Sequence, residues 1–256
     1  MSTVHLDISG PVAEMRLDNP SKLNALTMDM LHQIEAHCTT IEADKSVRAV
    51  LLTSTGDRAF CVGADIREWS ELDPRAFARD WVKRGHRCFD RIARLPMPVI
   101  GVLTGHAFGG GLELAATCDL RIAAPRATIA LPETGVGIVP GWSGTQRLVR
   151  QLPPAILKEM ALSGARLSAE RAHQVGFLNA IADDPHAAAH DMAAKISGSG
   201  PQATETAKWL ISAALDEDAG ACIEALAGAA MAPTAEKVEG VAAFAEKRSP
   251  DFGDMS

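Results

Sequence analysis

Two glutamates interrupt apolar segments of the chain. Glu113 lies between Leu112 and Leu114, and Glu133 follows an apolar run that ends at Pro132. A carboxylate in apolar surroundings is costly unless it is paired, hydrogen-bonded or protonated. If both carboxylates face one pocket, their repulsion separates their proton affinities, and one can act as acid and the other as base. Alternatively, Glu113 is a favourable charge at a helix N-terminus and Glu133 a loop carboxylate or N-cap partner.

Two segments rich in small residues follow predicted strands. They are Phe60–Asp65 and Gly105–Glu113. Small residues there allow backbone N–H groups to approach a ligand without side-chain obstruction, and two N–H groups that converge on one oxygen form an oxyanion hole. The glycines 109–111 also open a predicted helix, whose first N–H groups favour negative charge. We expect an enolate oxygen to be stabilised there, unless the glycines serve only close packing of helix on strand.

Several motifs of other enzyme classes are absent. The run 105–111 lacks the GxGxxG spacing of a dinucleotide site, and no GxxxxGK[ST] occurs. The segment GWSGT at 141–145 nearly matches a nucleophile elbow, but Thr145 occupies the place of the second small residue. This difference argues against Ser143 as the nucleophile of a hydrolase.

Metal and disulfide sites are not expected. His186 and His190 lie on one face of a predicted helix, but no third ligand accompanies them, so a solvated helix face is the simpler interpretation. The five cysteines are odd in number, lie far apart and form no CxxC pair. We expect reduced, mostly buried thiols at Cys38, Cys61, Cys88, Cys118 and Cys222.

Composition indicates one globular unit, or one core with a small appendage. The chain has 256 residues, 47% of them hydrophobic, and a net charge of −7. A negative balance argues against nucleic-acid or membrane-surface binding, which needs clustered Lys and Arg. No apolar run reaches the ~18 residues of a membrane span, and the N-terminal residues do not resemble a secretion signal. We therefore expect a cytoplasmic protein.

Strands alternate with helices in the first part of the chain, which predicts an α/β fold. Two alternating runs within 4–18 flank Gly10-Pro11 and predict a hairpin. Helical spacing over 24–41 predicts a helix with Thr27 as a possible N-cap. Further strands are expected at 47–52, 98–103, 120–123 and 128–131.

The second part of the chain is mostly helical by its pattern. A strand is possible at 178–181, and SGSGP at 197–201 is the best candidate for a linker to a helical appendage. This appendage could pack on the core or on a partner subunit. Helices are expected at 146–152, 155–162, 169–175, 187–196, 204–215, 219–230 and 234–247.

The chain resembles the enoyl-CoA hydratase/isomerase family, the crotonases, over nearly its whole length. The segments that carry the resemblance are NPSKLNAL at 19–26, AFCVGADI at 59–66, PVIGVLTGHAFGGGLEL at 98–114, LPE at 131–133, GTQRL at 144–148 and FAEKR at 244–248. The resemblance implies an α/β spiral of ββα units over residues 1–197 and a helical trimerisation region over 198–256. It also implies a homotrimer or dimer of trimers, an acyl-CoA thioester as substrate, and no cofactor other than the coenzyme A of that substrate.

The resemblance also implies site residues. The oxyanion hole would be formed by the backbone N–H groups of Val62 and Gly110. Lys247 would approach the nucleotide end of coenzyme A from the C-terminal region. The other positions implied to bind substrate are Lys22, Leu23, Ala25, Gly63, Ala64, Asp65, Ile66, Gly141 and Trp142.

Both acidic positions of the hydratases are occupied. In that interpretation Glu113 activates a water for attack at C3, Glu133 delivers a proton to C2, and the N–H group of Gly141 helps to hold the water. The alternatives are an enoyl-CoA isomerase, or another crotonase acting on a branched or polar acyl-CoA. A non-catalytic acyl-CoA-binding or RNA-associated module is a third hypothesis, against which the two glutamates and the acidic net charge count.

Trp142 and Ser143 depart from the family's common Pro-Gly-Ala-Gly-Gly pattern. A bulky indole beside the acyl pocket could shorten or reshape that pocket. Alternatively, the ring turns outward as ordinary packing.

Overall fold

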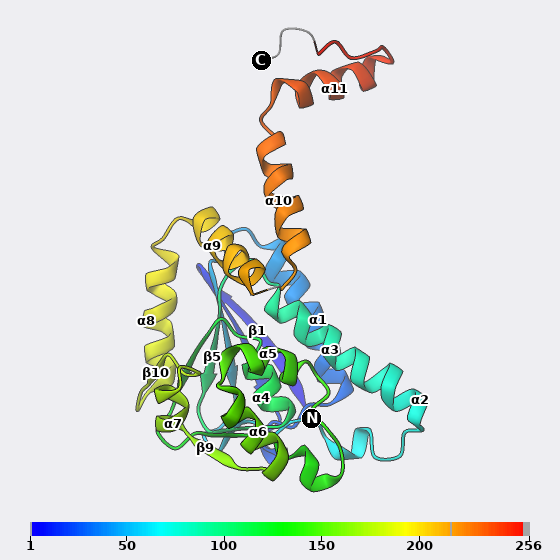
Figure 1. Ribbon diagram of the computed structural model, residues 1–256. Helices are drawn as coiled ribbons and strands as arrows, with labels where there is room; N and C mark the ends of the chain where they lie inside the picture. Colours follow the sequence, from blue (N-terminus) through cyan, green and yellow to red (C-terminus); the bar gives the residue numbers. More distant parts are fainter. Residues whose placement is uncertain (1, 216, 253–256) are drawn as a thin grey trace. The chain divides into compact units, whose positions relative to one another are not determined.

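The chain divides into two compact units. The computed structural model describes residues 2–215 and 217–252, and the ribbon is drawn in Figure 1. The first unit extends to Glu205 and the second begins at Thr206, so the division falls within helix α9 (Pro201–Ala214). The sequence pattern places this boundary a little earlier, between 197 and 198.

A six-stranded sheet forms the centre of the first unit. Its strand order is β1-β2-β3-β5-β7-β10, with an antiparallel β1–β2 hairpin and parallel pairing from β2 to β10. The predicted hairpin and strands of this sheet are confirmed. The bounds are β1 Thr3–Ser9, β2 Val12–Asp18, β3 Ala49–Ser54, β5 Val99–Leu103, β7 Leu120–Ala123 and β10 Ala180–Ile181.

A second sheet is built from short strands in the order β4-β6-β8-β9. Each of β3, β5 and β7 in the first sheet is followed by one strand of the second, and helices follow each pair, which gives a repeated ββα unit. After β8 the helices α5 and α6 lead to β9 of the second sheet, and α7 then leads back to β10. The sequence pattern predicts β8 but shows only small-residue loops at β4 and β6. The bounds are β4 Ala59–Cys61, β6 His106–Phe108, β8 Thr128–Ala130 and β9 Arg166–Ser168.

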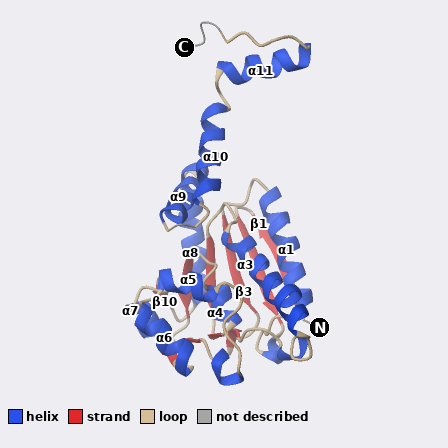
Figure 2. Cartoon of the chain, turned by 45° about the vertical axis from the view of Figure 1, so that its right-hand side comes forward, coloured by secondary structure: helices blue, strands red, loops and turns tan. Residues whose placement is uncertain are grey.

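Alternate residues of the first sheet face two separate cores. In β3, Val50 and Leu52 contact the larger core, which includes α1, whereas Ala49 and Leu51 contact α8. Figure 2 shows α1 and α8 on opposite faces of the sheet. Burial on both faces explains why these strands are continuous apolar runs rather than alternating ones.

Helix α1 (Met28–Ala43) begins as predicted. The side chain of its N-cap residue Thr27 accepts a hydrogen bond of 3.3 Å from the N–H group of Met30. The other helices of this unit that the sequence pattern predicts are α4 Gly110–Ala115, α5 Gly144–Gln151, α6 Pro154–Ser163, α7 Ala169–Gln174 and α8 Pro185–Ser197.

One helical segment is missing from the sequence-based predictions. It comprises α2 (Pro74–Ala76), a π-helical stretch η3 (Phe77–Val82) and α3 (Lys83–Ala93). Its many charged residues make the periodic apolar pattern hard to see in the sequence. The residues that the structure buries at regular spacing are Trp81, Gly85, Cys88, Phe89 and Ile92. That spacing is typical of a helix with one apolar face.

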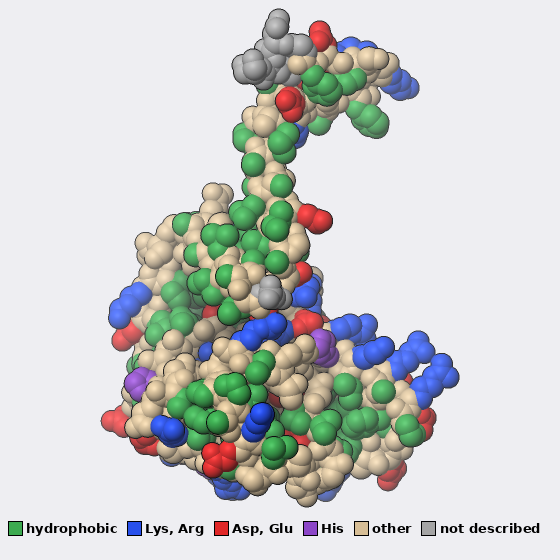
Figure 3. All heavy atoms as spheres, in the orientation of Figure 1, with side chains coloured by type: hydrophobic (Ala, Val, Ile, Leu, Met, Phe, Trp, Pro, Cys, Tyr) green, Lys and Arg blue, Asp and Glu red, His purple; other side chains and the backbone are tan. Residues whose placement is uncertain are grey.

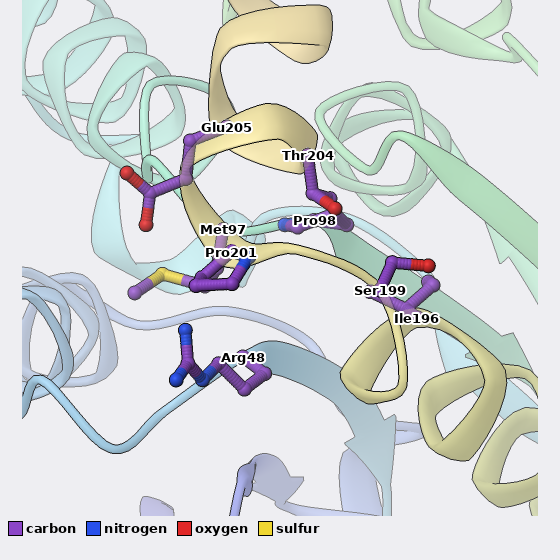
Figure 4. Close-up of a pocket in the computed structure, with 8 residues that line it drawn as sticks. All are labelled: Arg48, Met97, Pro98, Ile196, Ser199, Pro201, Thr204 and Glu205. Atoms are coloured by element: carbon purple, nitrogen blue, oxygen red, sulfur yellow. The ribbon is translucent and has the colours of Figure 1, made fainter.

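The start of α9 packs at the end of the first sheet. Figure 4 shows this joint, where residues from the β3 and β5 ends meet Ile196, Ser199 and Pro201. The space between these side chains is about 10 Å³, which is at most the volume of one water. This joint is therefore a packing contact and not a ligand site.

The second unit contains the end of α9, α10 (Ala219–Met231) and α11 (Ala235–Glu246). No helix of the described residues is both long and apolar enough to cross a membrane. Many large apolar side chains of this unit are exposed, namely Leu210, Ile211, Leu215, Ile223, Met231, Val238, Val241 and Phe244.

All five cysteines are buried, and none of them forms a disulfide in the described structure. Burial raises the pKa of the Cys38 and Cys61 thiols to about 12. These thiols are therefore protonated near neutral pH, as expected for structural cysteines.

Candidate active site

The two segments predicted to bind coenzyme A lie side by side. The N–H group of Leu26 donates to the carbonyl of Gly63 at 2.8 Å, and the N–H group of Asp65 donates to the carbonyl of Leu26 at 2.8 Å. Lys22 and Asp65, both predicted substrate contacts, form an ion pair with each other. Leu23 has a positive φ of 53° that bends the first segment toward the second.

The backbone N–H group of Val62 is already used. It donates to the carbonyl of Leu23 at 3.2 Å, contrary to the prediction that it is available for an oxyanion. Two residues on, the N–H group of Ala64 has no acceptor among the described residues, and neither does that of Gly110. A Cβ atom at Gly63 would lie 3.1 Å from the nitrogen of Gly110, so these segments converge.

The triple glycine serves both packing and chemistry. Gly109 has a φ of 52°, a conformation that favours glycine. A Cβ atom at Gly111 would lie 1.9 Å from the carbonyl oxygen of Cys61, so this glycine lets α4 approach β4. Gly110, between them, presents its N–H group at the first position of α4, where a helix has no internal acceptor.

Glu113 is held from one side by backbone donors. Its side chain is buried, and Oε1 accepts hydrogen bonds of 2.8 Å from the N–H groups of Trp142 and Gly144. Burial raises the pKa of Glu113, whereas the N–H groups of Gly144, Trp142 and Gly141 oppose that rise. The Gly141 N–H group, predicted to hold a water, thus also acts on this carboxylate.

Glu133 lies in a different environment from Glu113. It begins the 3-10 turn Glu133–Val136 and is buried, and burial raises its pKa to about 7, with a further rise from the charge of Glu113. Its Oε2 atom has no hydrogen-bond partner among the described residues. A Cβ atom at Gly109 would lie 3.0 Å from Oε1, so Glu133 borders the start of α4.

The indole of Trp142 turns inward. Its side chain is only 3% exposed, and its ring centroid lies 5.1 Å from that of Trp81 and 5.3 Å from that of Phe89. A Cβ atom at Gly110 would lie 3.1 Å from the indole Cε3 atom. The alternative of an outward-facing ring is therefore wrong, and the indole covers one side of the Gly110 backbone.

Ser143 joins this loop to α3. It has a positive φ of 77°, and its hydroxyl lies 2.7 Å from Nδ1 of His86, whose Nε2 atom is 3.4 Å from Asp90. Asp90 also pairs with Arg147 of α5. These contacts hold the turn at Ser143, whose neighbours Trp142 and Gly144 donate their N–H groups to Glu113.

Three basic residues near Leu23 were not predicted from the sequence. Arg58, His106 and Arg126 line a pocket of about 250 Å³ together with Leu23 and Asp57. They come from separate elements, so their proximity depends on the fold and has no signal in the sequence pattern. Among residues 2–215 and 217–252, no three His, Cys, Asp or Glu side chains are grouped as metal ligands would be.

Two predicted site residues lie apart from these groups. Ile66 begins the 3-10 turn Ile66–Glu68 and is 53% exposed. Lys247 follows α11 in the second unit and is exposed, so its predicted approach to coenzyme A stays a prediction.

Comparison with known proteins shows the family. The profile of the enoyl-CoA hydratase/isomerase family matches residues 7–255. The protein YngF of Bacillus subtilis, named as an enoyl-CoA hydratase/isomerase, is 40% identical over 245 residues that cover 93% of this chain and 92% of the relative. The short-chain-enoyl-CoA hydratase of Clostridium acetobutylicum is 34% identical, with 97% and 96% covered.

Solved structures agree with the sequence comparison. The crystal structure of an enoyl-CoA hydratase from Bacillus anthracis has a TM-score of 0.81 to this chain and 33% sequence identity. The match covers 97% of this chain and 98% of the other. The spiral of ββα units expected from the resemblance is thus confirmed. The chain belongs to the enoyl-CoA hydratase/isomerase family and has its crotonase fold.

Proposed function

We propose that the protein is an enoyl-CoA hydratase, which adds water reversibly and in syn geometry to a 2-enoyl-CoA thioester. The observation that carries this proposal is the contrast between two buried carboxylates at the start of α4. Burial raises the pKa of both, but Glu113 accepts two backbone hydrogen bonds that oppose the rise and favour its ionised form, whereas Glu133 has a pKa of about 7 and an unbonded oxygen. One group is thus suited to be a base and the other an acid.

The thioester oxygen would accept hydrogen bonds from the two available N–H groups, those of Ala64 and Gly110. Ala64 replaces Val62 in this role, because the N–H group of Val62 is bonded to Leu23. Enolate charge on that oxygen would also be favoured by the N-terminus of α4. Glu113 would take a proton from water as it attacks C3, and Glu133 would protonate C2.

Coenzyme A would bind along the paired segments 22–26 and 62–66. In the pocket next to Leu23, Arg58 and Arg126 offer positive charge for its phosphates. Such local cations would allow an anionic ligand to bind a chain with a net charge of −7. No separate cofactor is needed for this reaction.

An isomerase is the second candidate. A single carboxylate can move a proton between C2 and C4 without water, and Glu133 has the unbonded oxygen and the pKa of about 7 that this requires. In this case solvent oxygen would not enter the product.

Incubation with crotonyl-CoA in heavy-oxygen water tests the proposal. We expect loss of the conjugated-thioester absorbance together with heavy oxygen in the product. Glu133→Gln should slow hydration by about 10²–10⁴-fold, since it removes the proton donor. Glu159→Gln, an exposed position on α6, is the matched control and should keep full activity.

Other outcomes would change the assignment. Unchanged hydration in Glu133→Gln would contradict the role of this residue. Double-bond migration in β,γ-unsaturated substrates without oxygen uptake would favour the isomerase. Tight acyl-CoA binding without turnover on any substrate would favour a non-catalytic module.

A further inference from the structure

Four cations lie at every fourth position of the segment α2–η3–α3. They are Arg75, Arg79, Lys83 and Arg87, and we call them the cation row. All four are exposed, and none of their side chains has a hydrogen bond or ion pair within the part of the chain that the structure describes. Figure 3 shows Lys and Arg side chains gathered along α2 and α3.

The same segment pairs its cations on the face toward α1. Arg84 lies 3.4 Å from Glu35, and Arg91 lies 2.7 Å from Glu42. The cation row, in contrast, places like charges four residues apart, which destabilises a helix. An anion at the row would remove this repulsion.

The π-helical stretch keeps the row on one side of the segment. In an α-helix of about 3.6 residues per turn, an every-fourth pattern drifts slowly around the axis. The wider turns of η3 (Phe77–Val82) reverse this drift between Arg79 and Lys83. Four charges that would otherwise spread around the helix therefore line one surface.

This surface is hollowed. The cation row borders a recess of about 980 Å³, near the upper end of the range of small-molecule sites. One acid, Asp80, also lines the recess, so cations are in clear excess. The lining residues are Arg75, Arg79, Asp80, Val82, Lys83, His86 and Arg87.

The recess adjoins the loop that holds Glu113. Two side chains of its wall make this connection. The γ-carbons of Val82 lie 3.6 and 3.7 Å from where a Cβ atom of Gly141 would be, and Nδ1 of His86 lies 2.7 Å from the hydroxyl of Ser143. An acyl chain that extends from the reacting carbons past this loop would enter the recess.

We propose that the recess binds a carboxylate at the far end of the acyl chain, so that the enzyme selects coenzyme A thioesters of dicarboxylic acids. This inference rests on the proposed acyl-CoA substrate. The phosphates of coenzyme A are the other source of negative charge, but Arg58 and Arg126 already provide cations beside Leu23. The recess instead adjoins, through Val82 and His86, the loop that donates hydrogen bonds to Glu113.

Binding of two saturated thioesters tests the proposal without turnover. Pentanoyl-CoA and glutaryl-CoA have acyl groups of equal carbon number, and only the second ends in a carboxylate. We expect calorimetry at low salt to show about tenfold tighter binding of glutaryl-CoA, the scale of a hydrogen bond to a charged group. The double variant Lys83→Gln/Arg87→Gln should lose this preference and bind pentanoyl-CoA as before.

Arg91→Gln is the matched control. It removes a cation from the same helix, on the face that pairs with α1, and should keep the preference. Equal affinity of the wild type for both thioesters would overturn the inference. Equal weakening of both thioesters in the double variant would also overturn it, because the row would then bind the phosphates.

The proposed function fails separately. A wild type that prefers glutaryl-CoA but hydrates no enoyl-CoA would support carboxylate binding in the recess and refute the proposed hydratase activity. A wild type that hydrates crotonyl-CoA but binds both thioesters equally would support the hydratase activity and refute carboxylate binding in the recess. Failure to bind either thioester would refute both.

Discussion

Glu133 is the residue at which the chemistry should depend most on pH. Its pKa of about 7 means that the proton needed for C2 is lost as the pH rises through neutrality. We expect kcat/KM for hydration to fall on the alkaline side with an apparent pKa near 7. Glu133→Gln should remove this alkaline limb together with most of the rate, and a flat profile in the wild type would contradict the assignment.

The same ionisation affects stability. Because the pKa is raised in the folded state from an unfolded value of 4.5, the folded protein binds the proton more tightly. Its contribution to stability is complete below the unfolded pKa and is lost as the pH rises from about 4.5 to about 7, by up to about 3 kcal/mol. Urea unfolding at pH 5.5 and 8 should show a smaller loss in Glu133→Gln than in the wild type.

The sequence predicts the two carboxylates but not which backbone N–H group beside Gly110 is available. Glutamates in apolar runs are visible without a structure, because burial of a charge is rarely accidental. Which N–H group is available depends on backbone torsion, and Gly63 has a φ of 103° that no pattern reveals. The available N–H group is therefore that of Ala64, two residues after the predicted Val62.

At the level of elements, continuous apolar runs predict the central sheet, whereas β4, β6, β9 and the α2–α3 segment are not predicted. β4 and β6 have only three residues each, too few for a periodic signal. In α3 the helical signal includes a buried glycine, Gly85, whose presence makes the segment read as a loop. Its role depends on a contact with a residue far along the chain.

The absence of a side chain at Gly85 makes room for the indole of Trp142. A Cβ atom at this position would lie 2.2 Å from the indole ring. Gly85→Ala should destabilise the protein by about 1–3 kcal/mol, although alanine is the better helix former, because the ring has no room to move. Chemical denaturation measures this loss, and Trp142→Leu should relieve most of it.

Gly228→Ala is the matched control for that substitution. This glycine also lies within a helix, α10, but a Cβ atom there would meet nothing within 4 Å. It should stabilise its helix or leave it unchanged. A similar loss in Gly85→Ala with and without Trp142 would contradict the clash.

At the scale of the whole molecule, the second unit has an exposed apolar surface on α11. Val238, Val241 and Phe244 of α11 are 62%, 60% and 87% exposed. Contiguous exposed apolar side chains mark interaction sites. We propose that they pack on other subunits, as a trimer or a dimer of trimers.

Light scattering tests this assembly. We expect a mass of three or six chains for the wild type and a smaller species for Val241→Asp/Phe244→Asp. Glu236→Gln, a polar exposed change on α11, should leave the mass unchanged. A monomeric wild type would indicate that these helices fold onto their own first unit instead.

The buried thiol of Cys61 can be used to measure local unfolding of the structure around it. Cys61 ends β4 and accepts the N–H group of Gly63 at 3.4 Å, so its sulfur lies directly under the oxyanion segment. A thiol this well protected reacts with an alkylating reagent only when the surrounding structure transiently separates. The alkylation rate of Cys61, followed by peptide mass spectrometry, would therefore measure how often the segment around Gly63 opens transiently. A bound acyl-CoA should slow this alkylation.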